Sequence, residues 1–242
     1  MLKIALTAGH YKYTAGKKCL KSLDPKETAE WVLNDRIADK VERLLSSYDG
    51  YSLIRTDDTT GEKNITLSAR TNAANNFKAD IYVSIHHNAG VNGGKGGGII
   101  AYTYTKVDQE TKDWQKAFYN ALIAKTGLVG NRATPLGMAN LHECRETKMP
   151  AVLLELGFMD SSTDVPIILS EDFANKCAEA IVEVLVTKGG LVRKASSTNK
   201  VTESSKTTIY RVQVGAFSNK QNAYDMQKRL DALGFKSIIK ED

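Results

Sequence analysis

The segment Ile81–Asn88 constrains the fold most, because it has the pattern of a buried β-strand that ends on two histidines. Four of its first five residues are β-branched or aromatic, and the glycine-rich run over 90–98 that follows is typical of a loop. Residues 2–7 form a second apolar run, and His10 follows its end. Strands of open α/β sheets present ligands at their carboxyl ends. Histidines just past two strand ends are therefore predicted to lie in a functional site.

The first 187 residues alternate apolar runs with amphipathic segments, which predicts a mixed, mostly parallel α/β sheet flanked by helices. The further predicted strands are 51–55, 98–105 and 151–158, and the predicted helices are 26–44, 67–77, 108–125 and 171–187. With 42% hydrophobic and 25% charged residues, the chain can bury a core of ordinary size.

Two carboxylates fall at positions that should be buried. The stripe of Leu33, Ile37, Val41 and Leu44 extends backwards to Glu30, while Glu27 lies about 60° to one side of it. The helix is expected to begin near Lys26, with Asp24 and Pro25 as its cap and first residue. Glu155 interrupts the apolar run 151–158. A buried carboxylate must be paired, bind a cation or have a raised pKa, and a raised pKa suits proton transfer near neutral pH.

His10, His86 and one of Glu27 and Glu30 form a donor set that suits Zn²⁺, because zinc accepts imidazole nitrogen and carboxylate oxygen and leaves a position open for water. Zinc lowers the pKa of that water to about 7. Glu155 could then take the proton of the water and pass it to a leaving amine.

These residues resemble the zinc N-acetylmuramoyl-L-alanine amidases of the amidase-3 type. The likeness covers residues 2–187 and includes the segments Ala8–His10, Glu30–Asn34, Leu53–Asp57, Arg70–Asn75, Ser84–Ala89 and Met149–Phe158. It implies that His10, Glu30 and His86 bind zinc and that Glu155 is the catalytic acid/base. The spacing of the family's glutamate selects Glu30 over Glu27, as the apolar stripe does.

The resemblance implies a peptidoglycan hydrolase that cleaves the amide bond between N-acetylmuramic acid and L-alanine. The alternative is a zinc peptidase that cuts within the stem peptide of the cell wall. The family usually follows its first histidine with Gly-Gly and an Asp-Pro-Gly turn. Here residues 11–13 and a longer loop with Cys19 stand instead, and we expect this to alter the rim of the substrate groove.

Several other polar residues are interpreted by their place in the pattern. Side chains alternate along a strand, so His87 should face away from His86 and serve a structural role. Asn88 is the best candidate for a substrate contact. Arg55 and Arg70 are expected to form structural ion pairs, with contact to an acidic substrate group as the alternative for either. His142 is expected at the surface or lining the groove.

The C-terminal part differs in composition. Residues 188–207 are predicted to be a flexible basic linker, rich in Gly, Ser, Thr and Lys. Residues 208–242 predict a strand over 208–215, a helix over 219–233 and a strand over 235–239, and they resemble one half of a sporulation-related (SPOR-type) repeat. Such repeats bind peptidoglycan glycan strands and pair two halves in one sheet, so a homodimer through this half module is expected.

Charge and hydropathy bound the partners and the location. Residues 188–242 carry 11 Lys and Arg against 5 Asp and Glu, which favours an anionic envelope polymer; no nucleic-acid partner is predicted. No apolar run approaches the about 18 residues of a membrane span, and no secretory apolar region is recognised at the start. We therefore expect synthesis in the cytoplasm, no membrane insertion, and action on the cell wall after release, as a phage endolysin or a mother-cell autolysin. The 3 cysteines have no CxxC spacing and are predicted to be free thiols.

Overall fold

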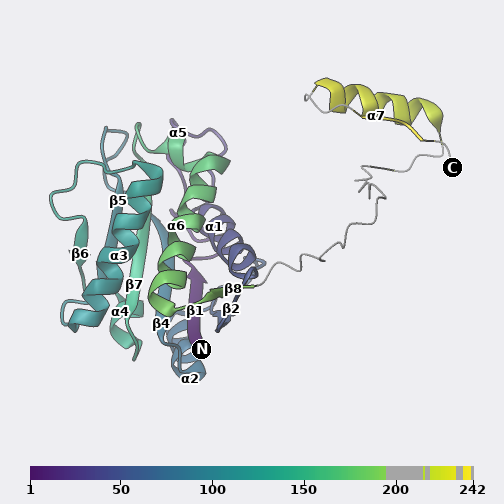
Figure 1. The fold of residues 1–242 in the computed structure, drawn as a ribbon. Coiled ribbons are helices and arrows are strands. Elements are labelled where there is room, and N and C mark those ends of the chain that lie inside the picture. Colours follow the sequence, from purple (N-terminus) through teal and green to yellow (C-terminus); the bar gives the residue numbers. More distant parts are fainter. Residues whose placement is uncertain (195–214, 216–218, 233–236, 241–242) are drawn as a thin grey trace, which may run out of the picture. The chain divides into compact units, whose positions relative to one another are not determined.

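The computed structural model describes residues 1–194, 215, 219–232 and 237–240 (Figure 1). The chain divides into two units, Met1–Ala195 and Ser196–Asp242, and each is described by itself. Within the described residues, no helix has both the length and the apolar character that crossing a membrane requires.

A six-stranded sheet forms the centre of the first unit, in the order β3-β1-β4-β7-β5-β6. Its strands are β1 (Leu2–Ala8), β3 (Tyr51–Arg55), β4 (Ile81–Asn88), β5 (Ile99–Thr103), β6 (Leu136–Met138) and β7 (Ala151–Phe158). Strands β3, β1, β4 and β7 run parallel, β5 is antiparallel to β7, and β6 is parallel to β5. The predicted mixed, mostly parallel sheet is confirmed.

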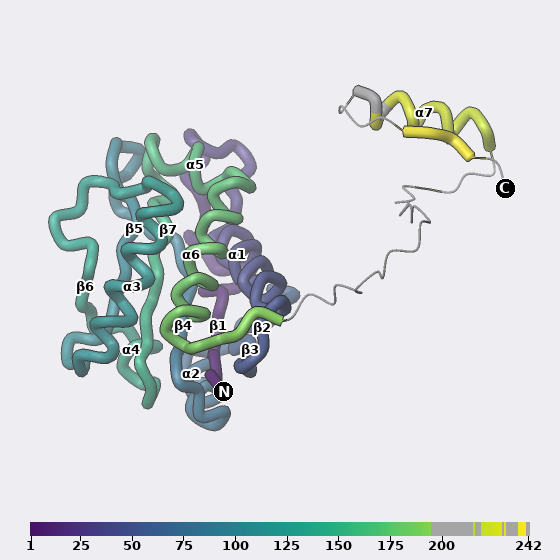
Figure 2. Tube along the Cα trace, viewed as in Figure 1, coloured from purple at the N-terminus to yellow at the C-terminus, as the bar shows by residue number. Residues whose placement is uncertain are grey.

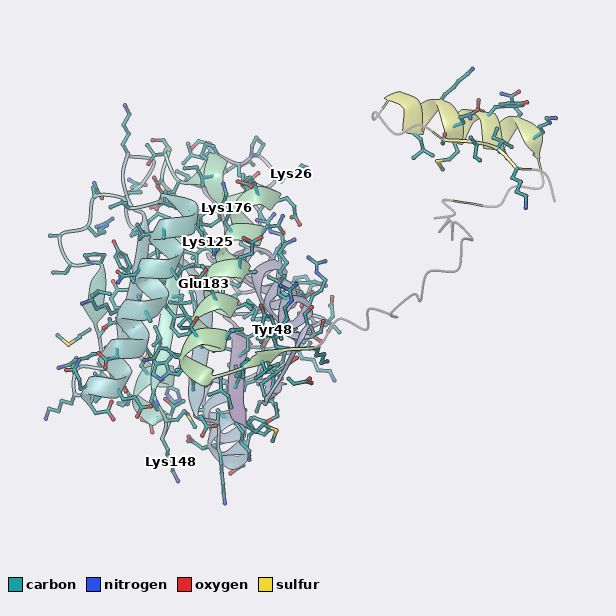
Figure 3. The ribbon with its side chains drawn as sticks, viewed as in Figure 1. Lys26, Tyr48, Lys125, Lys148, Lys176 and Glu183 are labelled. Carbon is teal, nitrogen blue, oxygen red and sulfur yellow. The ribbon has the colours of Figure 1, made fainter. Side chains whose placement is uncertain are left out.

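Helices cover both faces of this sheet. They are α1 (Glu30–Leu45), α2 (Leu67–Phe77), α3 (Gln109–Thr126), α4 (His142–Glu146), α5 (Val165–Ile168) and α6 (Glu171–Gly189). On one face α6 packs between α1 and α3 (Figure 2), and Lys125 of α3 pairs with Glu183 of α6 at 3.0 Å (Figure 3). Helices α2 and α4 pack together and against β1 and β7 respectively.

The core is divided by the sheet into two clusters. Ile4 and Leu6 pack in the large cluster with α1 and α6, whereas Ala5 and Tyr82 pack in a small cluster that includes Ala74 of α2. This follows from the alternation of side chains along a strand. Both faces of the central strands are therefore buried, as their near-continuous apolar sequences predict.

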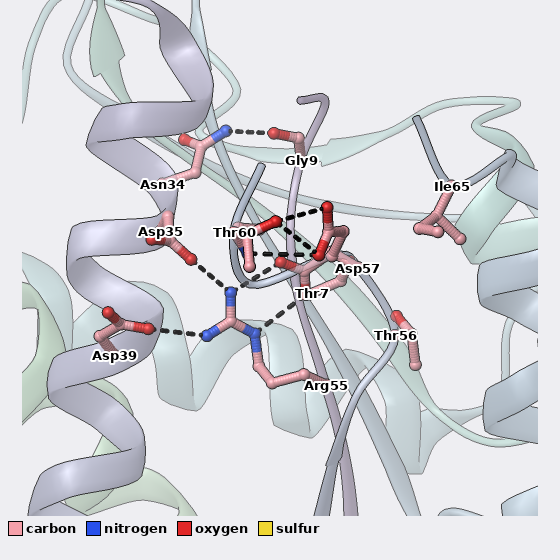
Figure 4. Close-up of polar contacts among 12 residues, drawn as sticks. Thr7, Gly9, Asn34, Asp35, Asp39, Arg55, Thr56, Asp57, Thr60 and Ile65 are labelled. Atoms are coloured by element: carbon pink, nitrogen blue, oxygen red, sulfur yellow. Dashed lines mark hydrogen bonds and ion pairs between the residues drawn. The ribbon is translucent and has the colours of Figure 1, made fainter. Parts of the chain in front are cut away.

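Arg55 links β3 to α1 through ion pairs. Its guanidinium, with a side chain only 6% exposed, lies 2.6 to 3.1 Å from carboxylate oxygens of Asp35, Asp39, Glu42 and Asp57 (Figure 4). The planar fork of an arginine suits several carboxylates at once. The ion-pair role predicted for Arg55 is confirmed.

Helix α1 begins four residues later than its sequence predicts. Asp24 accepts the backbone N–H groups of Lys26 and Thr28 at 3.2 and 2.7 Å and so closes a turn, and Glu27 has a positive φ of 50°. These local side-chain bonds compete with helix formation. The backbone N–H of Glu30 donates to the carbonyl of Lys17, so the preceding loop folds back onto the start of the helix.

The chain after α6 continues within the first unit as far as the structure describes it. Strand β8 (Val192–Arg193) pairs antiparallel with β2 (Tyr48–Asp49). Residues 195–207 of the predicted linker lie outside the described residues.

In the second unit, α7 (Lys220–Ala232) confirms the helix predicted over 219–233. The strand predicted over 208–215 lies outside the described residues except Gly215, and residues 237–240 have no strand assignment. The side-chain amide of Gln227 donates to the carbonyl of Ser237 at 2.9 Å, so the chain after α7 returns along the helix.

Candidate functional site

Three side chains from separate elements meet at the carboxyl edge of the sheet. His10 follows β1, Glu30 is the first residue of α1, and His86 lies in β4. One ligand atom from each residue can be chosen so that all three lie within 4.8 Å of one another. Nε2 of His10 is 3.2 Å from Oε2 of Glu30, and Nδ1 of His86 is 3.0 Å from Oε1 of the same carboxylate.

The donor set fits zinc. With bonds of about 2.1 Å, neighbouring ligand atoms around a tetrahedral zinc lie roughly 3.4 Å apart, which is close to the 3.2 and 3.0 Å between the histidine nitrogens and the Glu30 oxygens. Oε2 of Glu30 is buried, and no donor among the described residues reaches it in hydrogen-bond geometry. A buried carboxylate oxygen without a donor is costly unless a cation satisfies it. The nitrogen and oxygen donors that the sequence predicts as ligands are thus brought together.

The backbone at His10 is strained and is held by an arginine. His10 has φ = 68°, a conformation that residues other than glycine rarely adopt. The guanidinium of buried Arg70 donates to the carbonyls of Ala8 and His10, both at 2.6 Å, and to Oγ1 of Thr7 at 2.7 Å. Arg70 therefore binds backbone and hydroxyl oxygens instead of the carboxylate that we expected. It fixes the turn that presents His10.

Asn34, one helical turn after Glu30, connects the candidate ligand Glu30 to His87. Its amide nitrogen donates to the carbonyl of Gly9 at 3.1 Å (Figure 4) and lies 3.4 Å from Oε1 of Glu30. Its Oδ1 lies 2.8 Å from Nδ1 of His87, whose backbone N–H donates to Glu30. Because His87 is buried and bonded to Asn34, its contacts agree with the structural role predicted for it.

The charges in the site act on one another strongly. Burial opposes ionisation of Glu30, but the hydrogen bond and positive charge of His86 outweigh it and lower the pKa of Glu30 to about 2. Burial likewise disfavours protonated His86, but contacts with Glu143 and Glu30 raise its pKa to about 10. Burial lowers the pKa of His10 to about 4, against the attraction of Glu30. Glu30 is therefore an anion over the whole physiological pH range.

Glu155 lies beside the three candidate ligands and is not part of the group that could hold a metal ion. It pairs in register with His86 across β4 and β7. Its Oε2 is buried and has no hydrogen-bond partner within the part of the chain that the structure describes. Burial raises the pKa of Glu155 to about 7, although the nearby charge of His86 opposes the rise. A carboxyl group with such a pKa can both accept and donate a proton near neutral pH.

Two further residues contact the candidate ligands and were not among the site residues predicted from the sequence. Oε2 of Glu143 lies 3.5 Å from Nε2 of His86, and Nζ of Lys17 lies 3.8 Å from Oε2 of Glu30. Helix α4, which carries Glu143, has only 5 residues and gives no helical periodicity to detect. Its sole signal is an acidic residue close before the strand that carries Glu155.

The remaining site prediction concerns Asn88. Its Oδ1 accepts the backbone N–H of Ala89 at 2.8 Å, which closes a local turn at the end of β4. The substrate contact expected of Asn88 stays a prediction.

Comparison with known proteins agrees with this geometry. The family model described as N-acetylmuramoyl-L-alanine amidase matches residues 4–187, and the SPOR domain model matches residues 178–241. A crystal structure of N-acetylmuramoyl-L-alanine amidase from Clostridium difficile 630 has a TM-score of 0.67 and 26% identity, covering 77% of this chain and 95% of that one.

Two relatives extend the comparison. The sporulation-specific N-acetylmuramoyl-L-alanine amidase of Bacillus subtilis (strain 168) is 33% identical over 196 residues, which is 81% of this chain and 69% of the relative. N-acetylmuramoyl-L-alanine amidase CwlM of Bacillus licheniformis is 30% identical over 241 residues, 99% of this chain and 85% of the relative. The chain therefore belongs to the N-acetylmuramoyl-L-alanine amidase family and is an enzyme of that class.

Proposed function

We propose that this amidase hydrolyses the bond between N-acetylmuramic acid and L-alanine in peptidoglycan, with Zn²⁺ held by His10, Glu30 and His86. One observation carries the proposal: the ligand atoms of these three residues lie within 4.8 Å of one another, and the neighbouring Glu155 has a buried Oε2 with no hydrogen-bond partner among the described residues. Zinc, when bound, acts as a Lewis acid and lowers the pKa of a water ligand to about 7.

Glu155 is proposed as the general acid/base. It accepts a proton from the attacking water while the water oxygen bonds to the lactyl carbonyl carbon. It then returns the proton to the nitrogen of L-alanine as the C–N bond breaks, so one water is consumed and no proton is lost. The pKa of about 7 lets the same carboxyl group perform both transfers.

Product analysis tests this proposal. Purified peptidoglycan is digested with the zinc-loaded full chain, and new amino termini are labelled and identified. New L-alanine termini and free lactyl groups on muramic acid are expected. A new terminus inside the stem peptide would instead support the zinc peptidase alternative. The Glu155→Gln variant serves as the control, since contaminating hydrolases would act equally in both samples.

We further propose that the C-terminal unit binds peptidoglycan, which the SPOR match over residues 178–241 supports. The test compares sedimentation of the full chain and of a chain that ends at Lys194 with insoluble peptidoglycan. Ending at Lys194 retains β8 and its pairing with β2. Equal sedimentation of the two chains would contradict the proposal.

A homodimer is a separate proposal and rests on the half-repeat interpretation alone. Light scattering at micromolar concentration should give twice the 26.6 kDa mass of one chain. A monomer mass would contradict it without affecting the proposed amidase reaction.

A further inference from the structure

Glu143 lies on the side of His86 that faces away from Glu30. It is buried, at 4% exposure, in the short helix α4. Tyr82, Ser84 and His86 alternate along β4 and so present their side chains on one face of the sheet. The carboxylate of Glu143 contacts all three. The Tyr82 hydroxyl donates to Oε1 at 2.5 Å, the Ser84 hydroxyl donates to Oε2 at 3.2 Å, and Nε2 of His86 lies 3.5 Å from Oε2.

His86 is therefore placed between two carboxylates. Its Nδ1 contacts Oε1 of Glu30, on the side where His10 and Glu30 converge, whereas its Nε2 faces Glu143. The 3.5 Å contact is long for a hydrogen bond. However, Nε2 is buried, and no described residue provides it with a conventional hydrogen-bond partner. Among the described residues, the carboxylate of Glu143 is the acceptor that lies nearest to hydrogen-bond distance of this nitrogen.

An imidazole that binds a metal through one nitrogen carries its proton on the other, and an acceptor for that proton fixes both the tautomer and the ring orientation. We propose that Glu143 is a positioning residue of the metal centre: it accepts a hydrogen bond from Nε2–H of His86 and so directs Nδ1 toward the metal. This inference rests on the zinc site of the proposed function.

Two features support an ionised and immobile Glu143. The hydroxyl donors of Tyr82 and Ser84 each satisfy one carboxylate oxygen, which restricts rotation of the group. In addition, Zn²⁺ with the single carboxylate of Glu30 would leave a net charge of +1 in a buried site. The negative charge of Glu143 would oppose this positive charge, and a buried charge without compensation is strongly destabilising.

The test is the zinc affinity of Glu143→Gln, measured on the full chain by competition with a chromogenic chelator. Glutamine keeps the size of the side chain but lacks the charge that favours Nε2–H. We expect the dissociation constant to rise about 10- to 100-fold, as for other outer partners of metal-binding histidines. A change smaller than threefold would overturn the proposal.

Asp164→Asn is the matched control. Asp164 is also a buried carboxylate, at 1% exposure, and it accepts backbone N–H groups of Gly98 and Phe158. Its replacement should lower stability and leave zinc affinity within threefold of wild type. If both variants lost zinc in proportion to their stability, the role of Glu143 would be structural only, and the proposal would fail.

A second readout does not depend on the variant folding. Two-bond ¹H–¹⁵N spectra of the zinc-loaded wild type report which nitrogen of His86 carries the proton. Protonated Nε2 with metal on Nδ1 supports the proposal, and the opposite tautomer overturns it. If the wild type bound no zinc at all, the proposed zinc-dependent function would be refuted, and with it the basis for a positioning role of Glu143. Normal zinc binding by both wild type and Glu143→Gln would refute only the positioning role.

Discussion

His86 and Glu155 are paired residues in neighbouring parallel strands, β4 and β7. Their separation is set by the backbone hydrogen bonds of the sheet, so the proposed metal ligand His86 and the proposed acid/base Glu155 are held in fixed relation without a flexible loop. Sites built on strands are positioned more accurately than sites built on loops. This arrangement predicts that the two residues can be separated functionally by mutation.

Glu155→Gln should abolish turnover without loss of the metal. We expect kcat to fall about 10²- to 10⁴-fold, the usual contribution of a general acid/base. Zinc content, measured by mass spectrometry of the purified protein, should equal that of wild type. His86→Ala should lose both zinc and activity. Near-normal rates in Glu155→Gln would refute the proposed role of Glu155.

Zinc should stabilise the folded chain, because the ligands converge only when β1, α1 and β4 are assembled. A ligand that binds the native state alone contributes about 2.7 kcal/mol at 100 times its dissociation constant. Thermal unfolding in a chelator should therefore show a lower Tm, which returns on addition of zinc. The His10→Ala variant is the control, and its Tm should change little on addition of chelator or zinc. An unchanged Tm in wild type would argue against the site.

Arg70→Lys should destabilise the protein and weaken zinc binding together. Lysine cannot reproduce the fork that bonds the carbonyls of Ala8 and His10, so the strained backbone of His10 would lose its support. Hydrogen bonds to a charged group contribute about 1.5–3 kcal/mol, and we expect the free energy of unfolding, measured in urea, to fall by an amount in this range. The exposed Arg145, paired with Glu146, provides a control as Arg145→Lys with little expected effect.

The three thiols should be inert in the native state. Cys19, Cys144 and Cys177 are unpaired and buried, and burial raises the pKa of Cys19 and of Cys144 to about 12. A thiol reagent such as Ellman's reagent should titrate none of them before unfolding and all of them in denaturant. Rapid reaction of one thiol in the native protein would contradict this prediction and show that local unfolding exposes that thiol to solvent.

The strands and the convergence of the three candidate ligands were predictable because their signals are local. Strands β3, β4 and β7 have the predicted bounds, since each is an apolar run with a clear turn after it. The apolar stripe of α1 placed Glu30 at the buried face, and the structure buries it to 1% exposure. Periodicity reports burial, so it locates a carboxylate that needs a partner.

Other parts of the site depend on contacts between distant segments and gave no local signal. The role of Arg70 is visible only once α2 packs beside the end of β1, 60 residues away from its partner His10 in sequence. Likewise, α4 is too short for periodicity, and its Glu143 gains meaning only from the face of β4 that it covers. The start of α1 was misplaced because the side chain of Asp24 accepts the backbone N–H groups of Lys26 and Thr28, and the resulting turn replaces the first helical residues that we expected.

Gly9→Ala should disrupt the metal centre through a single added methyl group. A Cβ at Gly9 would lie 2.1 Å from Cε1 of His86, which is a severe steric overlap. The φ of Gly9 is outside the left-handed region, so alanine would add no backbone strain and the overlap alone makes the change unfavourable. His86 must move, and we expect zinc affinity to fall at least about tenfold, as when other supports of a metal-binding histidine are removed. Competition with a chromogenic chelator measures the zinc affinity.

Gly189→Ala is the matched control, because its Cβ would meet Cδ2 of Leu2 at 2.5 Å, away from the candidate ligands. Overpacking there should cost stability but leave zinc affinity unchanged. Equal zinc affinity in Gly9→Ala and wild type would show that the ring of His86 is not held against Gly9.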